Sequence, residues 1–316
     1  MSGLALTAHA AASAYGLATP ALLAGLRTGR APGGFAVPEV DIQALLGLKG
    51  TASMDRAAAL AVLTVGELLA AHPGLADPDT ALVLGTTSGS AGTQANVVRG
   101  SLTRRRPYFI EPSLVPFALM NGPASICAIR HGLRGPNATV AGGRAAVLSA
   151  LRYASRLIGG GQCARALVGG TEELTPEREW LEGQYPVQAG PLGEGAGVLL
   201  LEPPGPRPVL AEVLGFGSRL VAGDPVQEAV ADCVRGLLAR HRIEPGEVGL
   251  VSAPVELSGL LGAATVVDPA GLLGDTGAAA GLFQLIGVLT TGIGGPAVVV
   301  SVDQDHTVVA ALLRLP

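Results

Sequence analysis

Apolar residues recur at helical spacing over residues 54–71, the most regular pattern in the chain. Met54, Ala58, Ala61, Val65 and Leu68 come three or four positions apart, so they line one side of a helix. This segment therefore predicts a helix that covers a core. Residues 145–158, rich in Ala and Leu, predict a second helix.

Short apolar runs alternate with these helical stretches and read as strands. They occupy residues 82–85 (LVLG), 166–170 (ALVGG) and 197–201 (GVLLL). Strands that alternate with helices favour a sheet covered by helices on its faces. The pattern therefore predicts the α/β class.

The chain also reads as two copies of one pattern. Residues 139–160 predict a strand, a glycine turn and a helix, and residues 273–292 repeat the turn, the helix and a terminal glycine. A further strand follows each copy. The rigid Pro-rich link at residues 203–206 (PPGP) marks a seam. We therefore expect an N-terminal half over residues 1–205 and a C-terminal half over residues 206–316, packed into one compact unit.

Charged residues make up only 15% of the 316 residues, against about 25% in a typical soluble domain. So little charge fits a protein that buries much of its exterior against a partner, although small loops give the same figure. The net charge of −4 and the lack of a basic stripe exclude nucleic acid as a partner. One basic run, Arg104, Arg105 and Arg106, is either a solvated loop or a docking patch for an acidic partner, such as an acyl carrier protein.

The three cysteines, Cys127, Cys163 and Cys233, are widely spaced and form neither a metal-binding motif nor a disulfide framework. The first 26 residues lack the pattern of a signal peptide, and no apolar run approaches the ~20 residues that a membrane helix needs. We therefore expect a cytoplasmic protein that has no membrane partner, metal or cofactor.

Four segments, in order along the chain, resemble the β-ketoacyl synthases of the thiolase-fold superfamily. Residues 54–56 open a helix like an early helix of that family, and residues 132–140 (GLRGPNATV) are similar to the segment before its nucleophile. Residues 169–172 (GGTE) and 193–202 (GEGAGVLLLE) resemble a later strand and hairpin. The resemblance implies the five-layer αβαβα thiolase fold, built from two similar halves, in a dimer.

The residues that the family uses for catalysis are replaced. Arg144 stands where the family has its acyl-accepting cysteine, Pro254 where it has one histidine, and Asp275 where it has the other. An active synthase needs a thiolate at a helix N-terminus, and its two histidines stabilise the enolate that forms on decarboxylation. Arginine cannot be acylated, and an ionised aspartate would repel that enolate. The family's lysine falls near Ala270, and residues 302–306 (VDQDH) replace its oxyanion loop.

The resemblance thus implies a non-catalytic, chain-length-factor-like subunit without enzymatic activity of its own. Such a subunit pairs with a catalytic ketosynthase in a type II polyketide synthase, as half of a β-ketoacyl synthase heterodimer. It shapes the acyl tunnel and controls polyketide chain length. Its expected partners are that ketosynthase and, through it, an acyl carrier protein.

Two segments of the family reach across the dimer axis toward the partner's acyl pocket. By that resemblance, the tunnel residues here would come from residues 93–98 and 114–116. Asn96, Val97, Leu114 and Val115 are the candidates that face or gate the tunnel; ordinary interface packing is the other interpretation of these residues.

Two other functions stay open on the sequence. One is a divergent thiolase-fold acyltransferase or hydrolase that uses Arg144, Asp275 or His306, and the other is a homodimeric scaffold. A further expectation concerns the replaced site. Because a buried guanidinium is costly unless it is paired, Arg144 should contact a carboxylate, first Asp275, with Asp303 and Asp305 as alternatives.

Overall fold

The computed structural model describes residues 3–185, 190–221 and 225–316. Its strands within these ranges are β1 (Leu4–Ser13), β2 (Thr80–Thr86), β3 (Asn137–Ala141), β4 (Arg165–Glu172), β5 (Gly195–Glu202), β6 (Ala211–Leu220), β7 (Leu250–Ser252), β8 (Thr265–Val266), β9 (Gly295–Val302) and β10 (Thr307–Leu315). They form one ten-stranded sheet in the order β3-β2-β4-β5-β1-β6-β10-β9-β7-β8.

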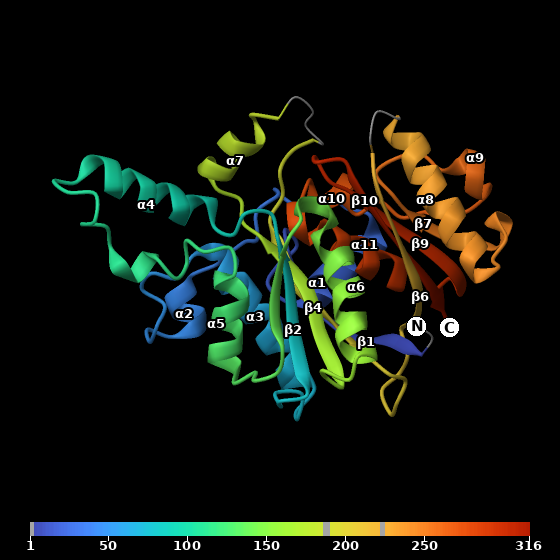
Figure 1. Cartoon of the computed structure of the whole chain (residues 1–316), viewed down its shortest axis with the longest axis horizontal. Coiled ribbons are helices and arrows are strands. Elements are labelled where there is room, and N and C mark those ends of the chain that lie inside the picture. The colour runs from blue at the N-terminus through green and yellow to red at the C-terminus, as the bar shows by residue number, and fades with distance from the viewer. Residues whose placement is uncertain (1–2, 186–189, 222–224) are drawn as a thin grey trace.

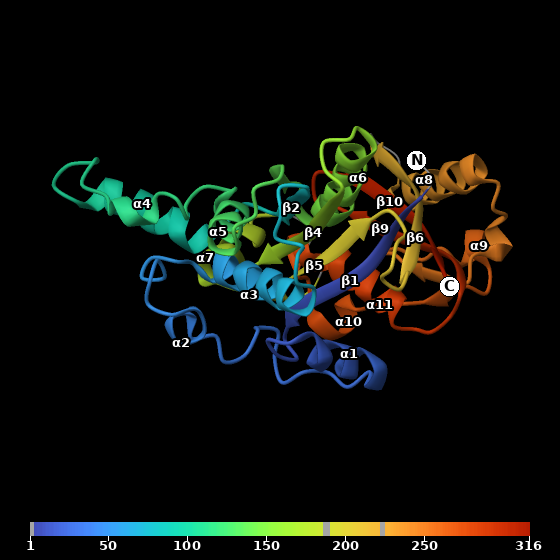
Figure 2. The same ribbon diagram turned by 90° about the horizontal axis from the view of Figure 1, so that it is seen from below.

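The helices surround this sheet and also fill its centre (Figures 1 and 2). They are α1 (Thr19–Thr28), α2 (Ile42–Leu46), α3 (Arg56–Ala71), α4 (Ala91–Thr103), α5 (Gly122–His131), α6 (Ala146–Gly159), α7 (Pro176–Glu182), α8 (Val226–His241), α9 (Ser258–Leu261), α10 (Ala270–Leu273) and α11 (Ala280–Leu289). Short 3₁₀ turns are η1 (Pro112–Leu114), η2 (Gly143–Ala145), η3 (Pro245–Glu247) and η4 (Gly277–Ala279).

The two predicted halves carry the same strand order. The first five strands run β3-β2-β4-β5-β1, and the last five run β8-β7-β9-β10-β6 from the opposite edge. Parallel and antiparallel pairs also correspond, since β2 is parallel to β3 and β4 just as β7 is parallel to β8 and β9. The link between β5 and β6 contains residue 205, where the sequence places the boundary between the halves; this repeat favours that prediction.

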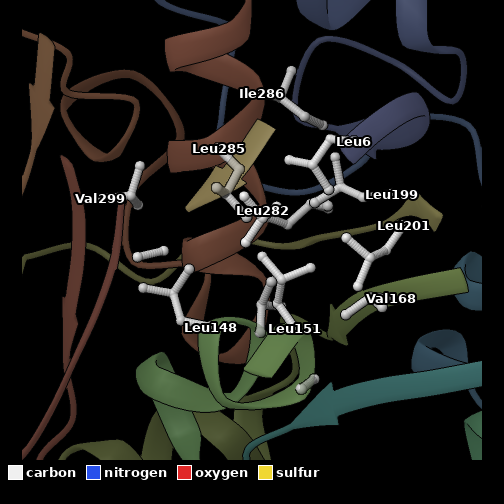
Figure 3. Close-up of a cluster of buried hydrophobic side chains, with 14 of the residues drawn as sticks. Leu6, Leu148, Leu151, Val168, Leu199, Leu201, Leu282, Leu285, Ile286 and Val299 are labelled. Carbon is white, nitrogen blue, oxygen red and sulfur yellow. The ribbon is translucent and has the colours of Figure 1, made fainter. Parts of the chain in front are cut away.

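The core lies around α6 and α11, which pack between the two halves of the sheet. Leu148 and Leu151 of α6 meet Leu282 of α11, and Leu199 and Val299 close the cluster from the two halves of the sheet (Figure 3). Helices α3 and α5 cover the outer face of the first half, and α8 covers the second. This is the five-layer αβαβα arrangement that the resemblance implied.

The helix predicted from residue 54 begins at Arg56, because Asp55 caps its N-terminus. Asp55 accepts a hydrogen bond of 2.7 Å from the N–H of Ala58. Its second carboxyl oxygen, Oδ2, is buried without a partner, and burial raises the pKa of Asp55 from 3.8 to about 6. Folding is therefore opposed by this group once the pH exceeds its unfolded pKa.

An Asp55→Asn change should stabilise the chain, because asparagine keeps the cap without the buried charge. A folded pKa above the unfolded one means that stability is lost as the pH rises toward about 6. We expect the change to raise the free energy of unfolding by ~2 kcal/mol at neutral pH. At pH ~5 the increase should be smaller by ~1 kcal/mol. Urea unfolding at the two pH values measures it; an equal change at both would show that Asp55 does not titrate as described.

Candidate functional site

Arg144 lies at the N-terminal end of α6, in the turn η2. The turn depends on Gly143, whose φ is +48° and whose Cβ, if it had one, would lie 2.0 Å from Oδ1 of Asp303. That same oxygen accepts a 2.8 Å hydrogen bond from the backbone N–H of Arg144. Asp303 follows the end of β9, so a carboxylate from the second half satisfies the N-terminus of a helix in the first half.

The second half repeats this arrangement at the start of α11, in the turn η4. Gly277 has a φ of +51°, close to that of Gly143. Its N–H donates to Oδ1 of Asp275 at 3.0 Å, and the N–H of Ala278 donates to Glu172 at 3.0 Å. Glu172 ends β4, so here a carboxylate of the first half satisfies a helix of the second. The donors at both helix ends are therefore already occupied by acidic side chains.

Arg144 and Asp275 form a buried ion pair, as the sequence predicted. Nε of Arg144 donates to Oδ2 of Asp275 at 2.9 Å, and Nη2 donates to the same oxygen. Oε2 of Glu182 lies 3.5 Å from Nη2. The exposed fractions of the three side chains are 15% for Arg144, 4% for Asp275 and 11% for Glu182.

The carboxylates hold Arg144 in its charged form. Burial alone would lower the pKa of its guanidinium. The bond to Asp275 and the charges of Asp275, Glu182 and Asp303 outweigh that effect, so the pKa of Arg144 is raised above its ordinary value. Three carboxylates around one guanidinium leave the replaced site with a net negative charge.

A second arginine, Arg178 of α7, fixes the segment that carries Asp275. Its Nη1 donates to the carbonyl oxygens of Glu173 and Gly193, both at 2.7 Å, and its Nη2 donates to the carbonyl of Asp275 at 3.0 Å. Its Nε lies 3.8 Å from Glu172. Burial raises the pKa of Glu172, while the charge of Arg178 opposes that rise.

The positions where the resemblance expects the family's catalytic residues line one cavity of about 340 Å³. Arg144, Pro254, Ala270 and Asp275 all contribute to it, and Phe283 adds to a largely apolar wall. A second cavity of about 190 Å³ lies on the other side of Arg144, where Glu179, Glu182 and Gln304 join the lining. No cysteine or histidine is among the described residues that line either cavity.

The other candidate nucleophiles and bases lie elsewhere. Cys127, Cys163 and Cys233 are buried in the core clusters, and burial raises the pKa of each thiol, which disfavours the reactive thiolate. His306 is exposed in the turn between β9 and β10, with a φ of +66°. Asp305 in the same turn is exposed, and its Oδ1 accepts a hydrogen bond from the N–H of Thr307; among the described residues, Arg144 pairs with Asp275 and Glu182 instead.

The four candidate tunnel residues lie on an arm formed by residues 91–120. The arm contains α4 and η1, and α4 projects away from the body of the molecule (Figures 1 and 2). Asn96 and Val115 are exposed, and Val97 and Leu114 are half-buried. None of the four lines the two cavities beside Arg144. Their placement on a projecting arm is compatible with contact to another chain, and their role stays a prediction.

The described part of the chain contains neither a membrane-spanning helix nor a cluster of possible metal ligands. None of its helices combines the length and the apolar character needed to cross a bilayer. Nor do three or more His, Cys, Asp or Glu side chains of residues 3–185, 190–221 and 225–316 come together as metal ligands would.

Comparisons with known proteins find ketosynthases. A family model, the beta-ketoacyl synthase N-terminal domain, matches residues 28–184. The solved ishigamide ketosynthase/chain length factor is 36% identical, with a TM-score of 0.93 over 99% of both chains. A type II PKS acyl-carrier protein in complex with its ketosynthase gives a TM-score of 0.82 over 100% of both chains at 15% identity, which shows the fold alone.

Curated relatives match over shorter stretches. The 3-oxoacyl-[acyl-carrier-protein] synthase 2 of Rhizobium meliloti (strain 1021) is 27% identical over 199 residues, which are 52% of this chain and 47% of that protein. The chain therefore spans about half the length of the curated relatives that it matches.

Proposed function

The chain belongs to the β-ketoacyl synthase family and is chain-length-factor-like, and we propose that it is a non-catalytic subunit that pairs with an active ketosynthase in a type II polyketide synthase. The observation that best supports this proposal is the Arg144–Asp275 ion pair, at the positions where the resemblance expects the family's cysteine and histidine. In this proposal the subunit helps to shape the acyl tunnel and so controls polyketide chain length. It would act in the cytoplasm, without a cofactor.

The chemistry of the cavity supports the absence of condensing activity. Condensation needs a thiolate that accepts the acyl group and hydrogen-bond donors that stabilise the enolate. The 340 Å³ cavity offers a paired guanidinium, the proline ring of Pro254 and the carboxylate of Asp275 in those places. Its Ser301 hydroxyl donates to Gln284 at 2.8 Å and has no histidine beside it in the described lining.

An open sheet edge supports pairing with a second protein. Strand β3 lies at one edge of the sheet and, among the described strands, pairs with β2 alone, so one row of its backbone groups is left free for a partner strand. Ile129 of the adjacent α5 is 77% exposed. A long run of exposed apolar residues continues along the arm: Val98, Leu102, Tyr108, Phe109, Val115, Leu119 and Met120.

These features together favour an obligate interface. Isolated exposed apolar residues are normal on a soluble protein, but so many of them within one projecting segment favour an interaction surface. Obligate interfaces are rich in apolar groups and bury more than ~2,000 Å² in total. The likeness to a ketosynthase/chain length factor makes a catalytic ketosynthase the proposed partner. An acyl carrier protein would be reached through that complex.

Co-expression with a ketosynthase that has an intact Cys-His-His site tests this function. We expect a 1:1 heterodimer in size-exclusion chromatography, and aggregation or self-association of this chain alone, because its apolar arm would be uncovered. Incubation of the complex with acyl-loaded carrier protein, followed by intact-mass analysis, should place the acyl adduct on the ketosynthase only.

Two results would contradict the proposal in different ways. A well-behaved monomer at micromolar concentration that ignores every ketosynthase offered would exclude the partner role. A stable acyl adduct on this chain would instead favour the alternative, a divergent acyltransferase or hydrolase. The cavity has room for a small substrate, but the exposed His306 lies outside its lining, so that alternative lacks a histidine base near Asp275.

A further inference from the structure

The cavity of about 340 Å³ beside Arg144 contains two buried hydroxyls that are not bonded within the chain. Ser252 ends β7 and Thr276 precedes η4; both line the cavity, and they are 1% and 2% exposed. Neither hydroxyl has a hydrogen-bond partner among the described residues, whereas the hydroxyl of Ser301 in the same lining donates to Gln284. Because buried polar groups nearly always have a partner, a molecule that enters the cavity has to supply these bonds.

Apolar side chains form most of the remaining wall. Leu273 and Phe283 are each 1% exposed, and Pro269, Val300 and Val302 complete this part of the lining. Water in such a space would bond to the hydroxyls but would face apolar groups on its other sides. A volume of about 340 Å³ lies at the lower end of the range for small-molecule sites, about 300–1,000 Å³. The lining therefore suits a small molecule with one polar head and a short apolar tail.

The charges around the cavity are mostly negative. Arg144, Asp268 and Asp275 lie in its lining, and Arg144 is already paired with Asp275. Next to Arg144, Glu182 lies 3.5 Å from its Nη2, and Asp303 accepts a hydrogen bond from its backbone N–H. Four carboxylates and one guanidinium leave these surroundings with a net charge of −3.

This negative charge selects a cationic head group. The neighbouring pair of Arg178 and Glu172, 3.8 Å apart, changes little, since the net charge would still be −2 with Glu172 protonated. A protonated primary amine carries three N–H donors, so it can bond to both hydroxyls and is attracted by the carboxylates. A carboxylate head would be repelled, and an alcohol would gain the hydrogen bonds without the electrostatic attraction.

We propose that this cavity binds a small apolar primary amine in its protonated form, with the ammonium group at Ser252 and Thr276 and the tail against Leu273 and Phe283. Binding is reversible, and no covalent bond forms. The inference does not depend on the partner in the proposed function. It goes beyond that function because it assigns a ligand of this chain's own to a cavity without condensing chemistry.

Calorimetric titration with three probes of one chain length, 1-pentylamine, 1-pentanol and pentanoate, tests the site. The full chain is used in complex with its ketosynthase, or alone if no complex forms, so that a failure of pairing does not decide the ligand question. At neutral pH the amine is protonated, as a lysine side chain is. We expect the amine to bind about tenfold or more tightly than the alcohol, and the carboxylate to bind most weakly.

Substitutions in this chain assign the binding to this cavity. Ser252→Ala with Thr276→Val removes both hydroxyls and nearly keeps the side-chain shapes, so amine binding should weaken about tenfold or more. Ala270→Trp fills the cavity from an exposed lining position and should abolish binding, which provides a second test if the first variant does not fold. Asp268→Asn keeps an acceptor for Gly271 and should lower the preference for amine over alcohol about threefold.

A matched control removes two buried hydroxyls elsewhere in the chain. Ser155 and Thr64 are 1% and 0% exposed, and each donates to a carbonyl oxygen of its own helix. Ser155→Ala with Thr64→Val should leave the amine affinity within about twofold of wild type. A loss as large as that of the cavity variant would attribute the effect to general destabilisation and overturn the proposal.

The probes provide the remaining outcomes. If the amine does not bind, or binds equally well to the Ser252/Thr276 and Ala270 variants, the cavity is not its site and the proposal is wrong. An alcohol that binds as tightly as the amine would show a neutral apolar pocket instead of a cation site. Tightest binding by pentanoate would show that Arg144, and not the carboxylates, determines what enters, which would also overturn the proposal.

Discussion

Replacing Arg144 with alanine should lower the free energy of unfolding by ~3 kcal/mol, the lower end of the cost of breaking a buried ion pair from one side. The change leaves Asp275 and Glu182 buried at 4% and 11% exposure without their cation. It also removes packing from the wall between the two cavities. Urea unfolding of the purified complex, followed by circular dichroism, measures the loss.

A paired variant distinguishes electrostatics from lost volume. Arg144→Met with Asp275→Asn removes both charges, while asparagine can still accept the hydrogen bond from Gly277. We expect this double variant to be clearly more stable than Arg144→Ala, because replacing both partners of a buried pair can be nearly neutral. Equal destabilisation by the two variants would mean that the ion pair is not what stabilises this region.

A bulky residue at position 114 should shorten the polyketide without separating the subunits. Leu114 is half-buried at the end of η1, on the arm that carries the exposed apolar surface. If its side chain faces the partner's acyl pocket, Leu114→Trp fills space that a growing chain would occupy, and products should lose one or more extension units. Mass spectrometry of the products, with chromatography of the heterodimer, gives both readouts.

Val266→Trp is the control for this change. Val266 is 69% exposed on β8, which forms the edge of the sheet opposite β3. The Val266→Trp change should give the same products as the wild type. A gating role is refuted if Leu114→Trp and bulky changes at Asn96, Val97 and Val115 all give unchanged products from an intact heterodimer.

The fold could be predicted because its signals are local and repeated. The 54–71 pattern gave the helix α3, and the similar segments at 139–160 and 273–292 became the turns and helices around η2 and η4. What periodicity could not provide is the order of the strands. That order depends on contacts distant in sequence, such as the pairing of β1 with both β5 and β6.

The site was predicted only in part. The positions of Arg144 and Asp275 follow from motifs, and the cost of an unpaired buried charge then requires their contact. Arg178 and Glu182 were missed. They lie on α7, between two recognisable motifs, and the sequence of that helix resembles an ordinary charged surface. Only the folded chain shows that Arg178 is 3% exposed and that Glu182 reaches Arg144.

If the chain is non-catalytic as proposed, the exchange of carboxylates between the halves should make a return to catalysis difficult. A cysteine placed at position 144 would face Asp275, Glu182 and Asp303, and three negative charges would raise the pKa of its thiol where catalysis requires a lowered one. The same change would leave those carboxylates without their cation. If the chain is the non-catalytic subunit proposed above, we expect this single reversion to be less stable than the present sequence and no more active, so that a return would need several changes at once. On the proposed function, the ion pair would therefore stabilise the non-catalytic state of the chain against stepwise reversion.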